Sequence, residues 1–405
     1  MENIIDILEK RDFIEQITHD KELRELLSKE KVPFYIGFDP TADSLHVGSL
    51  VAMIVASHMQ KAGHKPIILV GGGTVTISDP TGKTDMRKMM SREEIDKNAV
   101  GCKAQLEKFI SFEGENGAIM VNNADWLLPL NFIDFMREIG SLFSVNKMLS
   151  ADCYKQRMET GLTFFEFGYM LLQSYDFLYL HDNYNCKLQI GGNDQWSNIL
   201  GGVDLIRRVG HSDSFGLTFK LLTTKDGKKM GKTEKGTIWL DPNRTSPYEF
   251  YQYWRNIDDA DVKNILTLLT FLDMEEINKL SNLPDEQINE AKRTAAFEIT
   301  KLVHGKDEAI KAENAAKALF EGTGDLENIP TTKTNTSDIS ILDALVLTDL
   351  APSKGQAKIL ISQGGITIND KKVEDTNCML SKNDFKDGFV IIKKGKKSFH
   401  KLELN

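Results

Sequence analysis

The order of apolar runs and turns in residues 34–73 constrains the fold of this chain more than any other feature. Residues 34–39 form a short apolar run ending in a Pro-Thr turn, residues 49–61 have helical periodicity, and residues 65–73 form an apolar run ending in glycines. This succession predicts a strand, a helix and a second strand, which together make a βαβ unit. Such a unit normally builds a parallel sheet with a right-handed crossover.

Two further runs, residues 120–125 and 186–192, predict additional strands, because each is apolar and ends in polar residues or glycine. Ligands of open parallel sheets bind beyond the carboxyl ends of the strands. We therefore expect the turns at residues 37–49, 71–87 and 191–195 to line one cleft. Ser49 stands where an N-cap of the following helix is expected, and residues 4–30 have helical periodicity throughout.

Differences in residue composition divide the rest of the chain into candidate domains. A length of 405 residues suggests about two or three domains. Residues 247–321 contain no strand-like run and are rich in Ala, Glu, Leu and Lys, which predicts a helical domain. Residues 322–338 are rich in Gly, Thr, Asn and Asp and predict a linker. Residues 339–405 then predict a compact α+β domain.

Charge and cysteine content limit the partners and the compartment. The net charge is −9, but residues 351–405 hold 11 lysines and six acidic residues, so the tail carries +5 and the rest −14. An acidic body with a basic end suggests a polyanionic ligand held at that end. Four scattered cysteines exclude a disulfide scaffold and favour a reducing compartment, and no metal site is predicted. No apolar run approaches the ~18 residues of a membrane span, so a soluble cytoplasmic protein is expected.

Residues 35–50 connect the first strand with the following helix. The free N–H groups and the macrodipole at the start of that helix favour phosphate. Thr41 and His46 add side-chain donors just ahead of it. A strand, a proline turn and a capped helix with an incidental histidine fit the same residues. Ile77 and Thr76 replace glycines that the P-loop and the dinucleotide fingerprint require, so neither motif is present.

Two other groups of side chains are candidates for chemistry. Tyr169, Gln173 and Asp176 have the spacing of one helical face, and a carboxylate in these apolar surroundings must find a partner. That partner can be a ligand or a neighbouring structural element. Lys229 and Lys232 lie in a glycine-containing loop, which suits either a phosphate clamp or a solvated hairpin.

With these residues in place, a family resemblance becomes clear. Residues 35–50 resemble the HIGH region of class I aminoacyl-tRNA synthetases, in the form found in bacterial-type tyrosyl-tRNA synthetases. Residues 229–233 resemble the KMSKS loop of that family, residues 191–196 its G-G-x-D-Q strand end, and residues 169–176 its amino-acid-binding helix. Residues 339–405 resemble an S4-type RNA-binding domain, so the resemblance covers nearly the whole chain.

The resemblance implies a fold class and a domain order. It predicts an α/β protein in which a Rossmann-like parallel-sheet catalytic domain is followed by an α-helical domain and a small α+β S4-like domain. The expected boundaries are a catalytic domain at 1–225 with a connecting insertion at about 115–165, a KMSKS-type loop and connection at 226–246, the helical domain at 247–321, a linker at 322–338, and the S4-like domain at 339–405.

The resemblance also implies a function. It predicts activation of L-tyrosine with ATP to tyrosyl-adenylate, transfer to the 3′ end of tRNA(Tyr), Mg²⁺ with the ATP phosphates, and a cytoplasmic homodimer without membrane contact. The implied tyrosine-binding residues are Tyr35, Asp79, Tyr169, Gln173, Asp176 and Gln195. The implied ATP-binding residues are Gly37, Asp39, His46, Gly48, Ser49, Gly192, Asp194 and Lys232. The implied catalytic residues are Thr41, His46, Lys83, Arg87, Lys229, Lys232 and Thr233, and the implied RNA contacts are Lys354, Lys358, Lys371 and Lys372.

The chain departs from the family pattern in two places. Ser49 stands where the second histidine of the HIGH tetrad is expected, and residues 351–405 contain no arginine where the S4 helix usually carries some. Two alternatives remain. A tryptophanyl homologue is disfavoured by Tyr35 with Asp176 and by the S4-like tail. A non-catalytic RNA-binding or splicing factor has only Ser49 in its favour.

Overall fold

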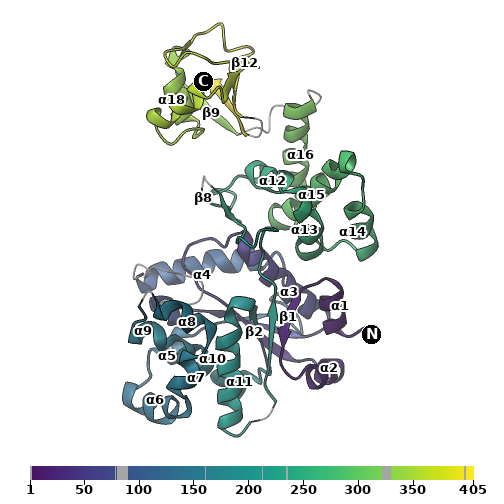
Figure 1. Ribbon diagram of the computed structural model, residues 1–405, viewed down its shortest axis with the longest axis vertical. Helices are drawn as coiled ribbons and strands as arrows, with labels where there is room; N and C mark the ends of the chain where they lie inside the picture. Colours follow the sequence, from purple (N-terminus) through teal and green to yellow (C-terminus); the bar gives the residue numbers. More distant parts are fainter. Residues whose placement is uncertain are drawn as a thin grey trace. The chain divides into compact units, whose positions relative to one another are not determined.

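The computed structural model describes residues 2–77, 79, 90–159, 161–211, 213–233, 236–321, 330–395 and 398–405. Lys83 and Arg87 lie outside these residues. The chain forms two compact units, one of Met1–Asp241 with Lys263–Asn282 and the other of Pro242–Val262 with Leu283–Asn405 (Figure 1). Among the described residues, no helix is both long enough and apolar enough to cross a membrane.

A six-stranded sheet in the order β1-β6-β5-β2-β3-β4 forms the centre of the first unit. The strands are β1 (Ile14–Ile17), β2 (Pro33–Phe38), β3 (Lys65–Val70), β4 (Ile119–Asn122), β5 (Leu188–Gly192) and β6 (Phe215–Phe219). All neighbours pair in parallel except β1, which is antiparallel to β6. The predicted parallel-sheet fold class is therefore confirmed.

The strand order creates the crevice that the sequence suggests. From β2 the chain moves outward through β3 to β4, and then returns to the other side of β2 for β5 and β6. The point where this direction reverses lies between β2 and β5, and in such sheets ligands bind there, beyond the carboxyl ends of the strands. Figure 1 shows α3 (Leu50–Lys61) on one side of the sheet, and α10 (Tyr169–Tyr184) and α11 (Trp196–Arg208) on the other.

The predicted continuous helicity of residues 4–30 is wrong. The structure has α1 (Ile4–Lys10), then strand β1, then α2 (Asp20–Lys29). Asp12 and His19 adopt positive φ angles of 56° and 45°, which interrupt a helix on either side of the strand. Because β1 is a four-residue edge strand stabilised by its pairing with β6, its own residues carry little strand signal.

Several shorter elements complete the first unit. Helix α4 (Arg92–Leu106) precedes β4, and α5 (Ala124–Leu127), α6 (Phe132–Glu138), α7 (Val145–Leu149), α8 (Asp152–Met158) and α9 (Phe164–Phe167) follow it. The expected insertion at about 115–165 thus begins before β4, a strand of the central sheet. Single turns of 3₁₀ helix occur at η1 (Val47–Ser49), η2 (Thr74–Thr76), η3 (Gly140–Leu142) and η4 (Asn193–Gln195), and a small hairpin at β7 (Lys232–Thr233) and β8 (Gly236–Thr237).

Residues 247–321 are helical, as the sequence predicts. The elements are α12 (Pro247–Arg255), η5 (Asp259–Asp261), α13 (Val262–Leu269), α14 (Met274–Ser281), η6 (Asp285–Gln287), α15 (Ile288–His304) and α16 (Lys306–Glu321). Helix α12 begins with a capping box in which Ser246 and Glu249 bond each other's backbone N–H groups. Helix α14 and most of α13 belong to the first compact unit, whereas α12, α15 and α16 belong to the second.

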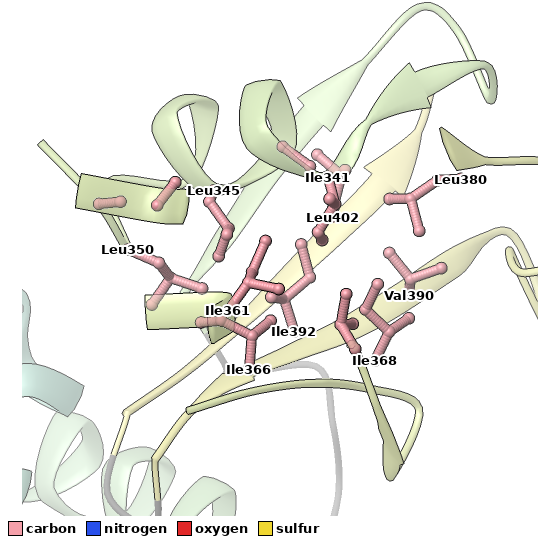
Figure 2. Packing of buried hydrophobic residues seen from close by; sticks show 14 of the residues in the cluster. Ile341, Leu345, Leu350, Ile361, Ile366, Ile368, Leu380, Val390, Ile392 and Leu402 are labelled. Atoms are coloured by element: carbon pink, nitrogen blue, oxygen red, sulfur yellow. The ribbon is translucent and has the colours of Figure 1, made fainter. Parts of the chain in front are cut away.

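The C-terminal domain has a five-stranded sheet, a separate two-stranded sheet and two short helices. Its elements are β9 (Thr331–Thr334), β10 (Ile339–Ser340), α17 (Ile341–Leu347), α18 (Lys354–Ser362), β11 (Ile366–Ile368), β12 (Lys371–Lys372), β13 (Met379–Leu380), β14 (Phe389–Lys394) and β15 (Ser398–Leu404). Figure 2 shows aliphatic side chains of α17, α18 and the strands packed into one core. Strand β9 pairs in parallel with β15, so part of the segment predicted as a linker belongs to this sheet.

A buried arginine explains why α13 and α14 associate with the first unit. The guanidinium of Arg11, only 7% exposed, donates to the carbonyl oxygens of Thr267 at 3.2 Å, Thr270 at 2.8 Å, and also Leu272. One cation therefore satisfies three carbonyls at the end of α13. Nearby, Lys61 of α3 lies over the ring of Phe271, with its Nζ 3.5 Å from the ring centroid.

Replacing Arg11 by methionine keeps the apolar stem but leaves these carbonyls without their donor. We expect Arg11→Met to lower the free energy of unfolding by about 3 kcal/mol or more, because each buried polar group left unpaired costs ~1–3 kcal/mol. Chemical denaturation measures this loss. Lys10→Met is the matched control at an exposed neighbour and should change stability by no more than about 0.5 kcal/mol. Equal stability of the two variants would contradict this role for Arg11.

Candidate functional site

The loops after β2 and β3 meet at the carboxyl edge of the sheet. The N–H of Gly71 donates to the carbonyl of Phe38 at 3.0 Å, which joins the glycine turn to the end of β2. A Cβ atom on Gly71 would lie 2.4 Å from Oδ1 of Asp39. A larger residue at this position would therefore displace the Asp39 side chain.

A buried carboxylate lies at the centre of the site. Asp176, on α10, is 2% exposed and accepts one hydrogen bond on each carboxylate oxygen. Asn123 Nδ2 donates to Oδ2 at 2.9 Å, and Trp126 Nε1 donates to Oδ1 at 2.8 Å. Burial raises the pKa of Asp176 to about 7, although the two hydrogen bonds act in the opposite direction.

Asn123 connects this carboxylate to the glycine turn. Its side chain is fully buried, and its Oδ1 accepts from the N–H of Gly73 at 2.7 Å. Its Nδ2 also donates to Oγ1 of Thr74 at 3.1 Å. Side chains from β4, from the turn after β3 and from α10 are thus held in one network around Asp176, which fixes the position of its carboxylate.

The hydroxyl of Tyr35 is a buried polar group beside this network. Tyr35 lies on β2, is 2% exposed, and its hydroxyl has no hydrogen-bond partner among the residues that the structure describes. Burial raises the pKa of this phenol, and the charge of Asp176 adds to the effect. Leaving a buried hydroxyl unsatisfied costs ~1–3 kcal/mol, so such a group normally bonds a protein group, a water or a ligand.

Acidic side chains surround the hydroxyl of Tyr169 at the start of α10. Burial raises the pKa of this phenol, and the charges of Asp39, Asp79 and Asp176 act in the same direction. Asp79 in turn accepts a hydrogen bond from Nε2 of Gln195 at 2.8 Å. This concentration of carboxylates produces a negative potential that favours a cationic group such as an ammonium.

The predicted tyrosine-binding residues are therefore brought to one region. Tyr35 comes from β2, Asp79 from the turn after β3, Gln195 from the end of β5, and Tyr169 and Asp176 from α10. Gln173 is half-buried on α10, one helical turn beyond Tyr169. Their proximity agrees with the grouping that the sequence predicts, while their roles stay predictions.

The HIGH-like segment begins α3 through an extra turn. Nδ1 of His46 accepts a hydrogen bond from the N–H of Gly48 at 3.0 Å, so His46 caps the 3₁₀ turn η1. A Cβ atom on Gly48 would lie 2.7 Å from the His46 ring, which explains the glycine. Ser49 occupies the N-cap position of α3, as predicted, but it lies inside this turn with helical dihedral angles and its side chain makes no capping hydrogen bond.

The lysine-bearing loop packs along the same segment. The N–H of Val47 donates to the carbonyl of Ile238 at 3.1 Å. Gly231 has a φ of 97°, and a Cβ atom there would lie 2.6 Å from Cγ2 of Val47. Lys229 Nζ lies 3.1 Å from Oδ2 of Asp194, which follows β5. The structure thus brings the predicted residues His46, Gly48, Asp194 and Lys229 to neighbouring backbone segments.

The remaining predicted residues lie in several places. Gly37 lies in β2, Thr41 is exposed on the loop after it, and Gly192 ends β5. Lys232 and Thr233 form the backbone of β7, and their side chains lie outside the described part of the chain, as do Lys83 and Arg87. Lys354, Lys358, Lys371 and Lys372 are exposed on α18 and β12 of the C-terminal domain.

Comparison with known proteins identifies the family. Residues 27–321 match the model of tRNA synthetases class I (W and Y), and residues 322–402 match the tyrosine--tRNA ligase SYY-like C-terminal domain. The chain is 58% identical over 408 residues to a tyrosine--tRNA ligase of Acetivibrio thermocellus, covering 100% of both chains. It is 59% identical over 404 residues to a tyrosine--tRNA ligase of Clostridium kluyveri, covering 99% of both.

The chain belongs to the class I tRNA synthetases, among its tyrosine--tRNA ligases. A solved C-terminally truncated mitochondrial tyrosyl-tRNA synthetase of Aspergillus nidulans superposes with a TM-score of 0.69 at 29% identity, over 79% of this chain and 95% of that chain. The predicted family, fold class and enzyme class are confirmed. The tryptophanyl and non-catalytic alternatives are not favoured by relatives of this identity.

Sequence reasoning missed Asn123, Trp126 and Thr74 in this synthetase site. Asn123 directly follows β4, so the rule that polar residues at strand ends line the cleft could have found it. Thr74 lies in the glycine turn that the same rule marks. No local signal indicates Trp126, because its role depends on a hydrogen bond to a residue 50 positions away.

The raised pKa of Asp176 predicts a pH dependence of stability. A free aspartate titrates near 3.9, so between about pH 4 and 7 the folded chain holds a proton that the unfolded chain has lost. The stabilisation from that proton is complete below about pH 4 and disappears as pH rises to about 7. We therefore expect wild type to lose stability across this window relative to Asp176→Asn, by up to ~1.4 kcal/mol per pH unit. Urea denaturation of both proteins at a series of pH values measures this difference. Equal changes of unfolding free energy with pH in wild type and Asp176→Asn would contradict it.

Proposed function

We propose that the chain activates L-tyrosine with ATP and transfers the tyrosyl group to the 3′ end of tRNA(Tyr). The observation that carries this proposal is the buried pair formed by Asp176 and Tyr35. Asp176 is held in place by two donors, and within the described part of the chain no group bonds the Tyr35 hydroxyl beside it. A phenolic hydroxyl can donate to the carboxylate and accept from Tyr35, which a phenylalanine side chain cannot do.

In this proposal the other end of tyrosine binds among the acidic groups. The ammonium group is held by Tyr169, Gln173 and Asp79, and Gln195 orients the Asp79 carboxylate through its 2.8 Å hydrogen bond. Because an ammonium has three donors and no acceptor, a site of carboxylate and phenolic oxygens is suited to it. Binding at both ends places the tyrosine carboxylate near the turn after β2.

We place ATP across the carboxyl ends of β2 and β5. Gly37, Asp39, Gly48, Ser49, Gly192 and Asp194 are the proposed contacts with the nucleotide. Asp194 and Lys229 form an ion pair between groups that are 29% and 57% exposed, and a pair this exposed is worth only ~0–1 kcal/mol. Breaking this ion pair, so that Asp194 can bind the ribose and Lys229 the phosphates, therefore costs little free energy.

The proposed reaction needs no protein nucleophile. An oxygen of the tyrosine carboxylate attacks the α-phosphorus of ATP, and the bond from that phosphorus to the bridging oxygen breaks to release pyrophosphate. Thr41 and His46 stabilise the phosphate charge, together with the cationic side chains of Lys83, Arg87, Lys229 and Lys232 and the hydroxyl of Thr233. Mg²⁺ enters with the phosphates. Positioning and charge stabilisation supply the catalysis.

Two partners complete the proposal. The exposed lysines 354, 358, 371 and 372 support tRNA binding by the C-terminal domain, through salt-dependent phosphate contacts. A homodimer is supported by large exposed apolar side chains concentrated between residues 128 and 165 of the chain, namely Leu128, Phe132, Ile133, Val145, Met158, Phe164 and Phe165. We place the protein in the cytoplasm, where tRNA, tyrosine and ATP are available together.

Amino-acid-dependent exchange of pyrophosphate into ATP tests the proposed function. Each of the twenty amino acids is supplied separately, with Mg²⁺ and without tRNA, so that only the activation step is measured. We expect exchange with tyrosine, because its hydroxyl alone satisfies both Tyr35 and Asp176. Exchange driven by tryptophan in preference to tyrosine, or by no amino acid, would refute the proposal.

A further inference from the structure

A group of histidine and aspartate side chains lies at the end of α10 remote from Tyr169. His181 and Asp182 are in the last turn of α10, and His211 follows the end of α11. Among the described residues, these three place one ligand atom each within 4.8 Å of one another. The activation site does not use them, and the sequence does not predict them, because 29 residues separate Asp182 from His211.

The three side chains converge on one carboxylate oxygen. Oδ1 of Asp182 lies 3.1 Å from Nδ1 of His181 and 3.2 Å from Nε2 of His211. In a tetrahedral zinc site, metal-to-ligand distances of ~2.0–2.2 Å place neighbouring ligand atoms about 3.3–3.5 Å apart. The two separations from Asp182 therefore lie within a few tenths of an ångström of those in a zinc site, and the ligand atoms of His181 and His211 lie within 4.8 Å of each other.

His181 contacts a carboxylate through each of its two ring nitrogens. Nδ1 of His181 faces Asp182, and its Nε2 faces Oδ1 of Asp213, also at 3.1 Å. The ring centroids of His181 and His211 are 4.5 Å apart, so the two imidazoles lie against each other beside Asp182.

Asp213 supplies the outer support that metal-binding histidines usually have. A ligating histidine commonly donates its other N–H to a carboxylate, which fixes the tautomer and directs the free nitrogen to the metal. Asp213 accepts from Nε2 of His181 in this way, and Lys187 holds Asp213 through an ion pair at 3.3 Å. Nδ1 of His181, on the other side of the ring, is then directed toward Asp182.

We propose that His181, Asp182 and His211 bind one zinc ion, with Asp213 orienting His181. Two imidazole nitrogens and one carboxylate oxygen are ligands that zinc prefers, and a fourth position remains for water. His181 is mostly buried, whereas Asp182 and His211 are more than 40% exposed, so an ion can reach the site from solvent. The ion joins the end of α10 to the connection between α11 and β6. Its role is structural, and the proposal is independent of the proposed function.

Zinc titration of the full chain, after chelator treatment and without ATP, tests the proposal. We expect wild type to bind one zinc ion per chain by calorimetry. His211→Asn should lower zinc affinity at least ~100-fold by removing a ligand, and Asp213→Asn by ~10–100-fold by releasing His181. Saturating zinc should raise the melting temperature of wild type by several degrees and leave that of His211→Asn unchanged.

His19→Asn is the matched control. His19 is exposed, lies outside the group and has a positive φ of 45° that asparagine accepts, so this variant should bind zinc as wild type does. Equal melting temperatures of all variants in chelator would show that each one folds. Absence of zinc binding in wild type, or wild-type affinity in His211→Asn, would overturn the proposal.

Discussion

The buried carboxylate of Asp176 is the group around which the site is organised. A charge in the interior requires hydrogen-bond donors, and here they come from Asn123 at the end of β4 and from Trp126 on α5. Asn123 also accepts from the N–H of Gly73, so the turn after β3 joins the same network. The end of β4, helix α5 and the turn after β3 are thus fixed relative to α10. Tyr35 lies beside this network on β2.

The nucleotide side of the site rests on weaker interactions. The loop that carries Lys229 follows the HIGH-like segment through backbone hydrogen bonds and the close approach of Gly231 to Val47. The side chain of Lys229 forms a partly exposed ion pair with Asp194, which solvent screens. In the proposed function, tyrosine binds at the hydrogen-bonded network around Asp176, and the phosphates engage the weakly held loop of Lys229.

The sequence predicted what depends on local pattern. The βαβ unit, the polar strand ends and the spacing of Tyr169, Gln173 and Asp176 follow from periodicity, and the structure brings these residues together. Strand β1 was missed because its partner β6 lies about 200 residues away, and Trp126 because its hydrogen-bond partner lies 50 positions away. Ser49 occupies the predicted N-cap position, but its side chain does not cap the helix, for a different reason. A 3₁₀ turn capped by His46 precedes the helix, and residue type alone does not reveal that turn.

The ratio of kcat/KM for tyrosine to that for phenylalanine, measured in pyrophosphate exchange, tests the central claim most directly. A site that hydrogen-bonds a substrate hydroxyl rejects the analogue without it by about 10⁴–10⁵, a range for which tyrosyl-tRNA synthetases are themselves the reference case. We expect wild type to fall in this range, Tyr35→Phe to lower the ratio about tenfold, and Asp176→Asn to lower it at least ~100-fold. An unchanged ratio in Asp176→Asn would contradict the account.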